Sequence, residues 1–397
     1  MIELGLFRRE MEEELANILG YWMRYAPDET HGGFVGKIDD QNKPHLQADK
    51  GSVLNSRILW TFSAAYRVTQ NPEYLLYAKR ACEYFIQHFI DPQYGGVYWT
   101  VNYMGNKADS KKQVYAQSFA LYALSEYYYA TKDATAKQAA ISLFEIIEQF
   151  SFDPRKGGYT DAFTQDWSVL ADLRLSAKDE NAKKTMNTHL HILEAYSNLY
   201  RVWPSEILKT KIENLLQYFR DYIIDARTGH LILFFDEDWN AKSTLISYGH
   251  DIEAAWLLQE AAETIDDPAW IEITKKIAIT MAAAASQGLD TDGGLWYEYE
   301  PATRKLIKEK HWWPQAEAIV GFFNAWQVSG QQQYLQFAWN SWSFIKKNIR
   351  DNAYGEWVWG VHQGNVVMKE QDKVGTWKCP YHNSRACMEL MKRIGGD

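Results

Sequence analysis

A glycine-containing turn followed by aromatic or β-branched residues occurs six times along the 397 residues. Successive turns lie 63, 62, 71, 65 and 61 residues apart, counted between Gly33, Gly96, Gly158, Gly229, Gly294 and Gly355. A period of this length is typical of a fold built from one repeated unit, in which each unit needs its neighbours to bury its faces. The repeat therefore limits the possible folds more strongly than any other feature of the chain.

Two helical patterns lie between consecutive turns. Residues 73–89 place apolar side chains on one stripe and charged ones on the other, which predicts an outer, half-solvated helix. Residues 114–130 are apolar or aromatic around most of the circumference, which predicts an inner helix packed on both sides. Six units of short β-hairpin, inner helix and outer helix predict an all-α (α/α)6 barrel. An open α-solenoid is the alternative, although its repeats are usually shorter and its loops smaller.

No linker-like stretch interrupts the chain, so we expect one domain over residues 1–397. The net charge of −9, with both signs interleaved, argues against nucleic acid or an anionic membrane as partner. Neither a signal peptide nor a membrane-spanning run is evident, which favours the cytoplasm. Three cysteines without a CxxC pair indicate neither a disulfide framework nor a zinc site. We expect a monomer or weak homodimer that binds a small neutral molecule.

Aromatic residues make up 15% of the chain, with 17 Trp and 25 Tyr. Many of them will be core residues, but Trp and Tyr also stack on sugar rings and hydrogen-bond to hydroxyls. The composition thus favours a carbohydrate ligand.

The start of each predicted inner helix contains a chemically distinctive cluster, and a closed barrel would turn all six toward one cavity. Helix starts offer free N–H groups and the positive end of the dipole, which favour an anion and keep a nearby histidine neutral. We therefore predict His250 and His382 as acid/base residues. His189 and His311 are more simply read as structural residues. Clustered histidines also suggest a metal, but their spacing does not suit a helix, and we expect no metal site.

Other side chains at these helix starts are candidate binding residues. Arg57 would be costly to bury unpaired, so it either has a carboxylate partner or reaches ligand oxygens. Glu253 follows His250 by three residues and could orient its imidazole, and Glu317 has similar standing. Candidates for stacking on a sugar are Trp312, Trp313 and Trp377.

Two reactions on a sugar are possible at such a site. Glycoside hydrolysis needs two facing carboxylates, one with a raised pKa. Proton abstraction beside a carbonyl needs bases that are neutral near pH 7 and donors that hold an enediolate. The helix starts are richer in His, Asn, Tyr and Arg than in free carboxylates, so they favour proton transfer.

Five segments also resemble the motifs of the N-acylglucosamine 2-epimerase superfamily and, within it, its cellobiose 2-epimerase branch. They are LNSRILWTFSAAY (54–66), MNTHLH (186–191), GHDIEAAWLL (249–258), HWWPQAEAIVGFFNA (311–325) and WKCPYHNSRAC (377–387). The resemblance covers nearly the whole chain. It implies an (α/α)6 barrel that interconverts glucose and mannose at the reducing end of β-1,4-linked disaccharides, without a cofactor.

The resemblance also implies residue roles. The residues matching His250 and His382 act as acid and base at C2, and the one matching His191 assists ring opening. Those matching Arg57, Tyr115 and Asn187 contact the open-chain sugar, those matching Trp313 and Trp377 stack on it, and the one matching Glu253 supports its histidine. A 2-epimerase or aldose–ketose isomerase acting on free mannose or glucose is the alternative within the family. A sugar hydrolase or a non-catalytic sugar-binding barrel is the alternative from another class.

Overall fold

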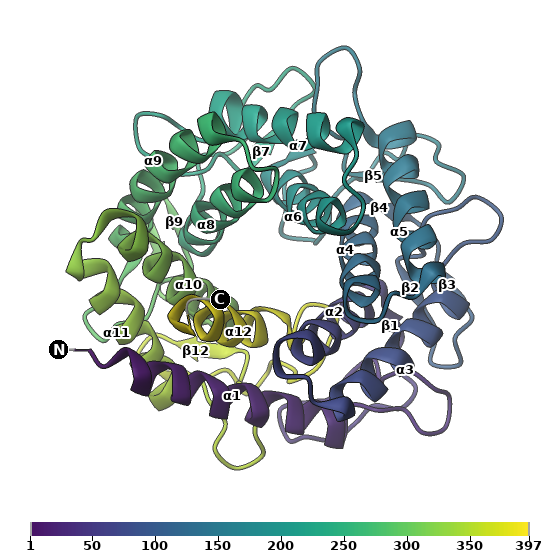
Figure 1. The fold of residues 1–397 in the computed structure, drawn as a ribbon, viewed down its shortest axis with the longest axis horizontal. Coiled ribbons are helices and arrows are strands. Elements are labelled where there is room, and N and C mark those ends of the chain that lie inside the picture. Colours follow the sequence, from purple (N-terminus) through teal and green to yellow (C-terminus); the bar gives the residue numbers. More distant parts are fainter. Residues whose placement is uncertain (1, 396–397) are drawn as a thin grey trace.

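The computed structural model describes residues 2–395. Within them, the helices form two concentric rings (Figure 1). The inner ring consists of α2 (Ser52–Thr69), α4 (Val114–Thr131), α6 (Met186–Val202), α8 (Tyr248–Thr264), α10 (Trp312–Ser329) and α12 (Tyr381–Gly395). The outer ring consists of α1 (Leu4–Tyr25), α3 (Pro72–His88), α5 (Ala134–Ile146), α7 (Glu206–Tyr218), α9 (Pro268–Ala285) and α11 (Gln332–Asn348). The predicted helices at 73–89 and 114–130 correspond to α3 and α4.

The ring is closed. Each inner helix packs on the inner helices of the neighbouring units, and α12 packs on both α10 and α2. The first helix, α1, lies along the last, α12, so the two ends of the chain complete the circle (Figure 1). The prediction of an (α/α)6 barrel is confirmed, and the open solenoid is excluded.

The two rings differ in burial as their sequences predict. In α4 every side chain from Val114 to Tyr127 is buried. In α3 the buried side chains are confined to one face, which includes Tyr74, Ala78 and Phe85. The inner helices thus have apolar surroundings on both sides, while the outer helices expose one face to solvent.

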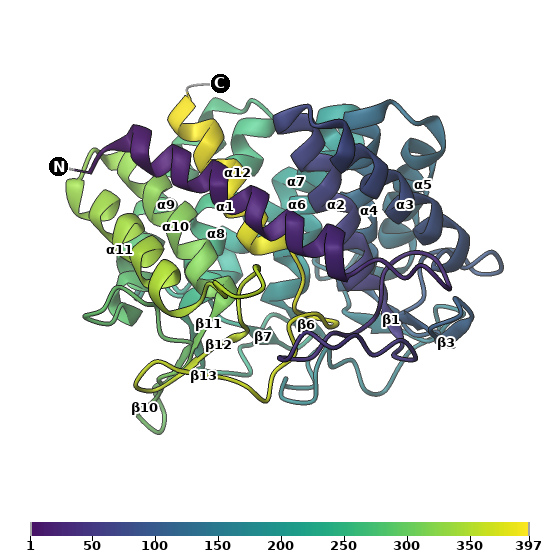
Figure 2. The same ribbon diagram turned by 90° about the horizontal axis from the view of Figure 1, so that it is seen from below.

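All the strands lie at one end of the barrel (Figure 2). In chain order they are β1 (Lys50–Gly51), β2 (Thr100–Val101), β3 (Lys107–Asp109), β4 (Lys112–Gln113), β5 (Ala162–Phe163), β6 (Lys184–Thr185), β7 (Phe234–Phe235), β8 (Ile246–Ser247), β9 (Glu298–Glu300), β10 (Lys305–Ile307), β11 (Lys310–His311), β12 (Gly360–His362) and β13 (Val366–Val367).

These strands join neighbouring units in antiparallel pairs. β1, β4, β6, β8 and β11 each precede an inner helix and pair with β2, β5, β7, β9 and β12 of the next unit. A bridge between Ile38 and Val374 joins the first unit to the last. The strand end of the barrel, which we call the mouth, is therefore continuous around the ring.

The six glycine turns differ from the expected hairpins. Each is closed by a single antiparallel bridge, such as Phe152 to Tyr159, and the strands proper lie farther along the chain. Close packing explains the glycines: Gly158 has φ +80°, and a Cβ there would lie 2.5 Å from Trp239 Cζ2. Only glycine fits both the left-handed backbone and that contact.

A buried ion pair fastens most of these turns. In the second unit Lys112 Nζ donates to Asp91 Oδ2 at 2.8 Å and to the Gly95 carbonyl at 2.8 Å. Although burial opposes it, this hydrogen bond lowers the pKa of Asp91 to about 2. Equivalent pairs are Lys50–Asp28, Lys184–Asp153, Lys310–Asp290 and Lys373–Asp351. Each lysine comes shortly before an inner helix, so the pair ties the turn to the start of that helix.

Candidate active site

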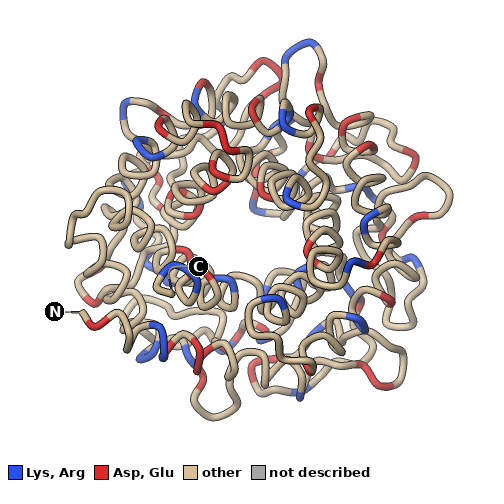
Figure 3. Tube along the Cα trace, viewed as in Figure 1, with Lys and Arg blue, Asp and Glu red and all other residues tan. Residues whose placement is uncertain are grey.

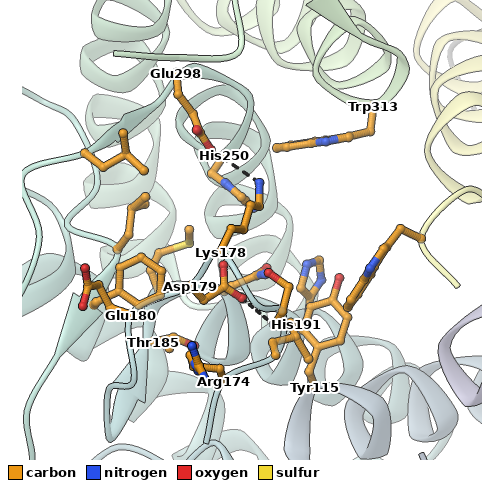
Figure 4. Close-up of a pocket in the computed structure, with 18 of the residues that line it drawn as sticks. Tyr115, Arg174, Lys178, Asp179, Glu180, Thr185, His191, His250, Glu298 and Trp313 are labelled. Carbon is orange, nitrogen blue, oxygen red and sulfur yellow. Dashed lines mark hydrogen bonds and ion pairs between the residues drawn. The ribbon is translucent and has the colours of Figure 1, made fainter. Parts of the chain in front are cut away.

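A cavity of about 310 Å³ opens at the mouth. Figure 4 shows His191, His250, Tyr115 and Trp313 around it. The inner-helix starts and the loops in front of them form its wall. Ten of the eleven predicted site residues line it: Arg57, Tyr115, Asn187, His191, His250, Glu253, Trp312, Trp313, Trp377 and His382.

His382 is 5% exposed and lies on α12. Its Nδ1 lies 2.7 Å from Glu317 Oε1 and 3.8 Å from Glu253 Oε1. Burial, together with the positive charges of Arg57 and Arg385, holds the pKa of His382 well below its usual value. Its imidazole is therefore neutral at pH 7, and Nε2 is left for a ligand.

Arg385, one turn farther along α12, joins the carboxylates beneath the cavity. Its Nη2 donates to Glu253 Oε1 at 2.7 Å and to Glu317 Oε1 at 2.6 Å, and its Nη1 donates to Glu194 and contacts the Tyr381 hydroxyl. Trp256 Nε1 donates to the other oxygen of Glu317 at 3.0 Å. Burial, reinforced by the nearby Glu317 charge, raises the pKa of Glu253 to about 8. One guanidinium thus holds a layer of acidic groups in place directly under the cavity.

His191 has a carboxylate partner of its own. Its Nδ1 lies 2.9 Å from Glu194 Oε2. Although burial opposes it, the charge of Arg385 lowers the pKa of Glu194 to about 2, so this partner is ionised. Burial lowers the pKa of His191, against the opposing effect of Glu194. His191 is thus held neutral, with Nδ1 donating to the carboxylate.

His250 lies near the start of α8 and has a different partner. Its Nδ1 lies 2.8 Å from the Ser247 hydroxyl. Burial lowers the pKa of His250 to about 3, and His191 and Lys178 act in the same direction. The ring centroid of Trp313 lies 4.6 Å from that of His250 and 5.7 Å from that of His382, so one indole contacts both imidazoles.

Arg57 has no carboxylate partner among the described residues. Its Nη2 donates to the Tyr115 hydroxyl at 2.7 Å, and its Nη1 lies 3.8 Å from Cys379 Sγ. Its guanidinium carbon lies 4.1 Å from the centre of the Phe119 ring. Its Nε is buried and unpaired within residues 2–395. Of the two readings of Arg57, this geometry favours the one in which it reaches ligand oxygens.

The Asn187 side chain is also incompletely paired. It lies at the start of α6 and lines the cavity, and its Oδ1 has no hydrogen-bond partner in the described chain. A buried amide oxygen without a partner is costly, and a ligand hydroxyl would relieve that cost.

The hypothesis that Glu253 orients His250 is wrong. Glu253 points to Arg385 across the barrel, and Ser247 takes the position beside His250. The long-range attraction of Arg385 outweighs the three-residue spacing on the helix. Glu317 lies behind His382 and away from the cavity surface, so it contacts the imidazole and not a bound sugar.

The three tryptophans also differ from one another. Trp313 is half-buried and faces the cavity (Figure 4), and Trp377 packs against Trp99 with centroids 5.9 Å apart. Trp312 is 2% exposed and packs against Trp359 with centroids 4.6 Å apart. Trp313 and Trp377 therefore have more surface available for a sugar than Trp312.

His189 is a structural residue, as expected. Its Nε2 accepts from the Tyr159 N–H at 3.0 Å and its Nδ1 donates to the Thr185 carbonyl at 2.7 Å. Both ring nitrogens are thereby used to attach the third glycine turn to α6.

One loop of the cavity wall was not anticipated. Residues 173–182, between β5 and β6, contribute Arg174, Lys178 and Asp179. Lys178 Nζ donates to the Tyr297 hydroxyl at 2.5 Å and lies 3.8 Å from Glu298 (Figure 4). The 71-residue spacing after Gly158, longer than the other spacings, was the signal in the sequence for this extra loop.

A buried carboxyl group, Asp161, was missed as well. It lines the cavity and accepts from the Thr185 hydroxyl at 2.6 Å. Burial raises the pKa of Asp161 to about 7. The Asp161 carbonyl accepts from the Val114 N–H at the start of α4, and in the fourth and sixth units the equivalent carbonyls belong to the apolar Leu233 and Trp359. Periodicity therefore gave no hint of an acid here.

Glu253, Glu317 and His382 place potential metal-ligand atoms within 4.8 Å of one another. Arg385 already donates to both carboxylates, so a guanidinium occupies the place beside them that a cation would take. In the view of Figure 3, basic and acidic residues are interspersed around the ring. None of the described helices is both long and apolar enough to cross a bilayer.

Comparison with known proteins gives extensive matches. The model of the N-acylglucosamine 2-epimerase family matches residues 32–386. A cellobiose 2-epimerase from Bacteroides fragilis is 48% identical over 97% of this chain and 99% of its own, and one from Dictyoglomus turgidum is 38% identical over 99% and 100%. The structure of cellobiose 2-epimerase from Bacillus thermoamylovorans superposes with a TM-score of 0.93, at 38% identity, over 98% of this chain and all of the other. The chain therefore belongs to the N-acylglucosamine 2-epimerase family.

Proposed function

We propose that this protein epimerises C2 of the reducing-end glucose in β-1,4-linked disaccharides, converting cellobiose to glucosylmannose and lactose to epilactose. The observation that supports this most strongly is the near full-length similarity to cellobiose 2-epimerases, at up to 48% identity among the relatives named above. The cavity chemistry supports it independently, because it combines neutral imidazoles with an unpaired cation and amide.

His250 and His382 are the proposed acid/base pair at C2. Each uses Nδ1 for a protein partner, which leaves Nε2 for the substrate. Both are neutral at pH 7, the form a general base needs, and both contact Trp313. A sugar stacked on this indole would lie close to both imidazoles.

The reaction then proceeds in four steps. The sugar ring opens, with His191 assisting proton movement at the oxygens. One imidazole takes the C2 proton, and the electron pair of the C–H bond moves onto the C1 carbonyl to give a cis-enediolate. The C2–C3 bond rotates, and the other imidazole returns a proton to the opposite face of C2. No redox partner is required, so we expect activity without a cofactor or metal.

The remaining predicted residues bind the sugar in this proposal. Arg57 and Asn187 have unpaired polar atoms and suit the enediolate oxygens. Tyr115 orients Arg57. Trp313 and Trp377 stack on the sugar units, and Glu253 holds the Arg385 guanidinium near His382.

The test is incubation of the purified protein, in the presence of EDTA, with cellobiose, lactose, mannose and N-acetylglucosamine, followed by chromatography. We expect glucosylmannose and epilactose. A ketose product would indicate aldose–ketose isomerisation, and turnover of mannose alone would indicate the monosaccharide enzyme. Release of glucose would indicate hydrolysis. Four unchanged sugars would indicate a binding protein and contradict the proposal.

A further inference from the structure

Four histidines line the cavity, and the three proposed to act on the sugar, His191, His250 and His382, have partners of two chemical kinds. His191 faces Glu194, and His382 faces Glu317. The Glu317 oxygen that faces His382 already receives an N–H from Arg385, and Glu194 is ionised, so both groups act as acceptors. Each of these imidazoles must therefore donate from Nδ1, which fixes one neutral tautomer with a lone pair on Nε2.

His250 has a hydroxyl partner instead. A serine hydroxyl both donates and accepts, and its hydrogen rotates to suit the partner. Ser247 is 1% exposed, and across residues 2–395 its hydroxyl makes no hydrogen bond other than the one to His250 Nδ1. This contact is therefore compatible with a proton on Nδ1 and equally with a proton on Nε2.

Ser247 lies where a serine hydroxyl usually caps a helix, but its hydroxyl binds His250 instead. Ser247 is the N-cap residue of α8, with extended backbone angles of φ −113° and ψ 100°. Serine in this position usually accepts from an N–H group of the first helical turn. The equivalent cap of α6, Thr185, does so, accepting from the Thr188 N–H at 3.2 Å. Within the described chain Ser247 makes no such bond, and its hydroxyl points to His250.

Resting on the proposed function, we propose that Ser247 is a positioning residue that lets His250 present either a lone pair or an N–H group to the sugar while it stays neutral. With Nδ1–H donating to Oγ, Nε2 is a base. With Oγ–H donating to Nδ1, Nε2–H is a donor. The two forms have the same charge and the same number of protons, so the group on the sugar decides between them. A reversible reaction that involves both a C–H proton and sugar oxygens can use both forms.

Burial supports this arrangement, because the imidazole remains uncharged at neutral pH. The residues with a fixed tautomer, His191 and His382, provide the internal comparison. Replacing Ser247 by aspartate would give His250 a carboxylate partner like theirs.

The direct test is nitrogen NMR of the full-length protein labelled with ¹⁵N-histidine, at neutral pH and without sugar. The His250 signals are assigned by their loss in H250Q. We expect both ring nitrogens of His250 to resonate between the limits for protonated and unprotonated imidazole nitrogen. In S247D they should separate to those limits, with Nδ1 protonated. Wild-type signals already at the limits would overturn the proposal.

Kinetics provide the second readout. We expect S247A to lower kcat for cellobiose at least about 10-fold while KM changes little, and S247T, which keeps the hydroxyl, to restore most of the rate. The Tm of S247A should fall only slightly, because the variant loses the single hydrogen bond to His250 and no cap bond. Wild-type kcat in S247A would overturn the proposal. Absence of epimerisation in the wild type would instead refute the proposed function, and the NMR result would still decide the role of Ser247.

Discussion

At the far end of the barrel charged side chains of the inner helices pair with one another, whereas at the mouth the charged Arg57 has no carboxylate partner among the described residues. Far from the cavity, Arg67 lies 2.7 Å from Glu126 and Arg201 lies 2.8 Å from Glu260. At the mouth, Asn187 Oδ1 and Arg57 Nε lack partners in the described residues, and His191, His250 and His382 use only Nδ1.

The helix connections differ in the same way. At the far end α2 stops at Thr69 and α3 begins at Pro72, with Asn71 capping the Glu73 N–H at 3.0 Å. Asp133 and Asp267 cap α5 and α9 likewise. At the mouth, among the described helix starts, the cap residues of α2, α4, α8 and α10 make no side-chain cap bond. Of the outer helices α3, α5, α7, α9 and α11, three begin with a side-chain cap, whereas of the inner helices α2, α4, α6, α8 and α10 only α6 does. More N–H groups are therefore available to a ligand at the mouth than at the far end.

The largest effect on catalysis is expected from removing an imidazole at the mouth. We expect H250A and H382A each to lower kcat for cellobiose epimerisation by about 10²- to 10⁴-fold, because each loses a general acid/base. Both side chains lie at the cavity surface, so the fold should persist, as circular dichroism would verify. Near-normal turnover in either variant would contradict the assignment.

The ion pairs that join a glycine turn to the start of an inner helix should affect stability and not catalysis. Asp91→Asn weakens a pair in which both side chains are fully buried, and we expect it to lower the free energy of unfolding by about 3–5 kcal/mol. Asp225→Asn is the matched control, because the fourth turn has the exposed Arg227 in place of a buried lysine. Equal losses in the two variants, measured by urea unfolding, would show that the buried pair adds nothing.

The same pair should make stability depend on acid pH. The pKa of Asp91 is about 2 in the folded protein and 3.8 as a free side chain, so its contribution is complete above pH 4 and disappears as pH falls through 2. The stability difference between wild type and D91N should therefore narrow over this range. A difference that stayed constant from pH 5 to pH 2 would show that the Asp91 charge is not its source.

The smallest effect is expected at a far-end cap. Asp133→Ala removes the acceptor of the Ala136 N–H and should cost about 0.5–2 kcal/mol of unfolding free energy, with kcat unchanged. Asp133→Asn keeps the acceptor and should restore most of the loss. Ser247→Ala at the mouth is expected to behave in the opposite way, with kcat reduced and Tm lowered only slightly. A lower kcat in D133A would contradict the expectation that side chains at the far end affect stability and not catalysis.

The sequence predicted the site residues whose positions follow from the repeat. It missed the residues whose contacts form across the ring. His250 and His382 were identified because each lies at the start of an inner helix that follows a repeated turn, and Asn187 was identified through the family resemblance. Arg385 and Glu194 were not, because they come from helices far apart in the chain and meet only when the barrel closes.

The misassignment of Glu253 has the same origin. A spacing of three residues suggested His250 as its partner, but the attraction of Arg385 from α12 determines where the carboxylate points. Ser247 was missed because a serine before a helix reads as an ordinary cap. The buried lysine–aspartate pairs recur in five units, yet lysine and aspartate in polar loops are indistinguishable by sequence from surface residues.

The central claim is that imidazoles at the mouth transfer a proton at C2, and isotope incorporation tests it most directly. Cellobiose is incubated with the protein in heavy water and both epimers are isolated. The account predicts deuterium at C2 of the newly formed mannose unit and, as the reaction reverses, at C2 of the recovered glucose unit. Formation of glucosylmannose with only protium at C2 would contradict it.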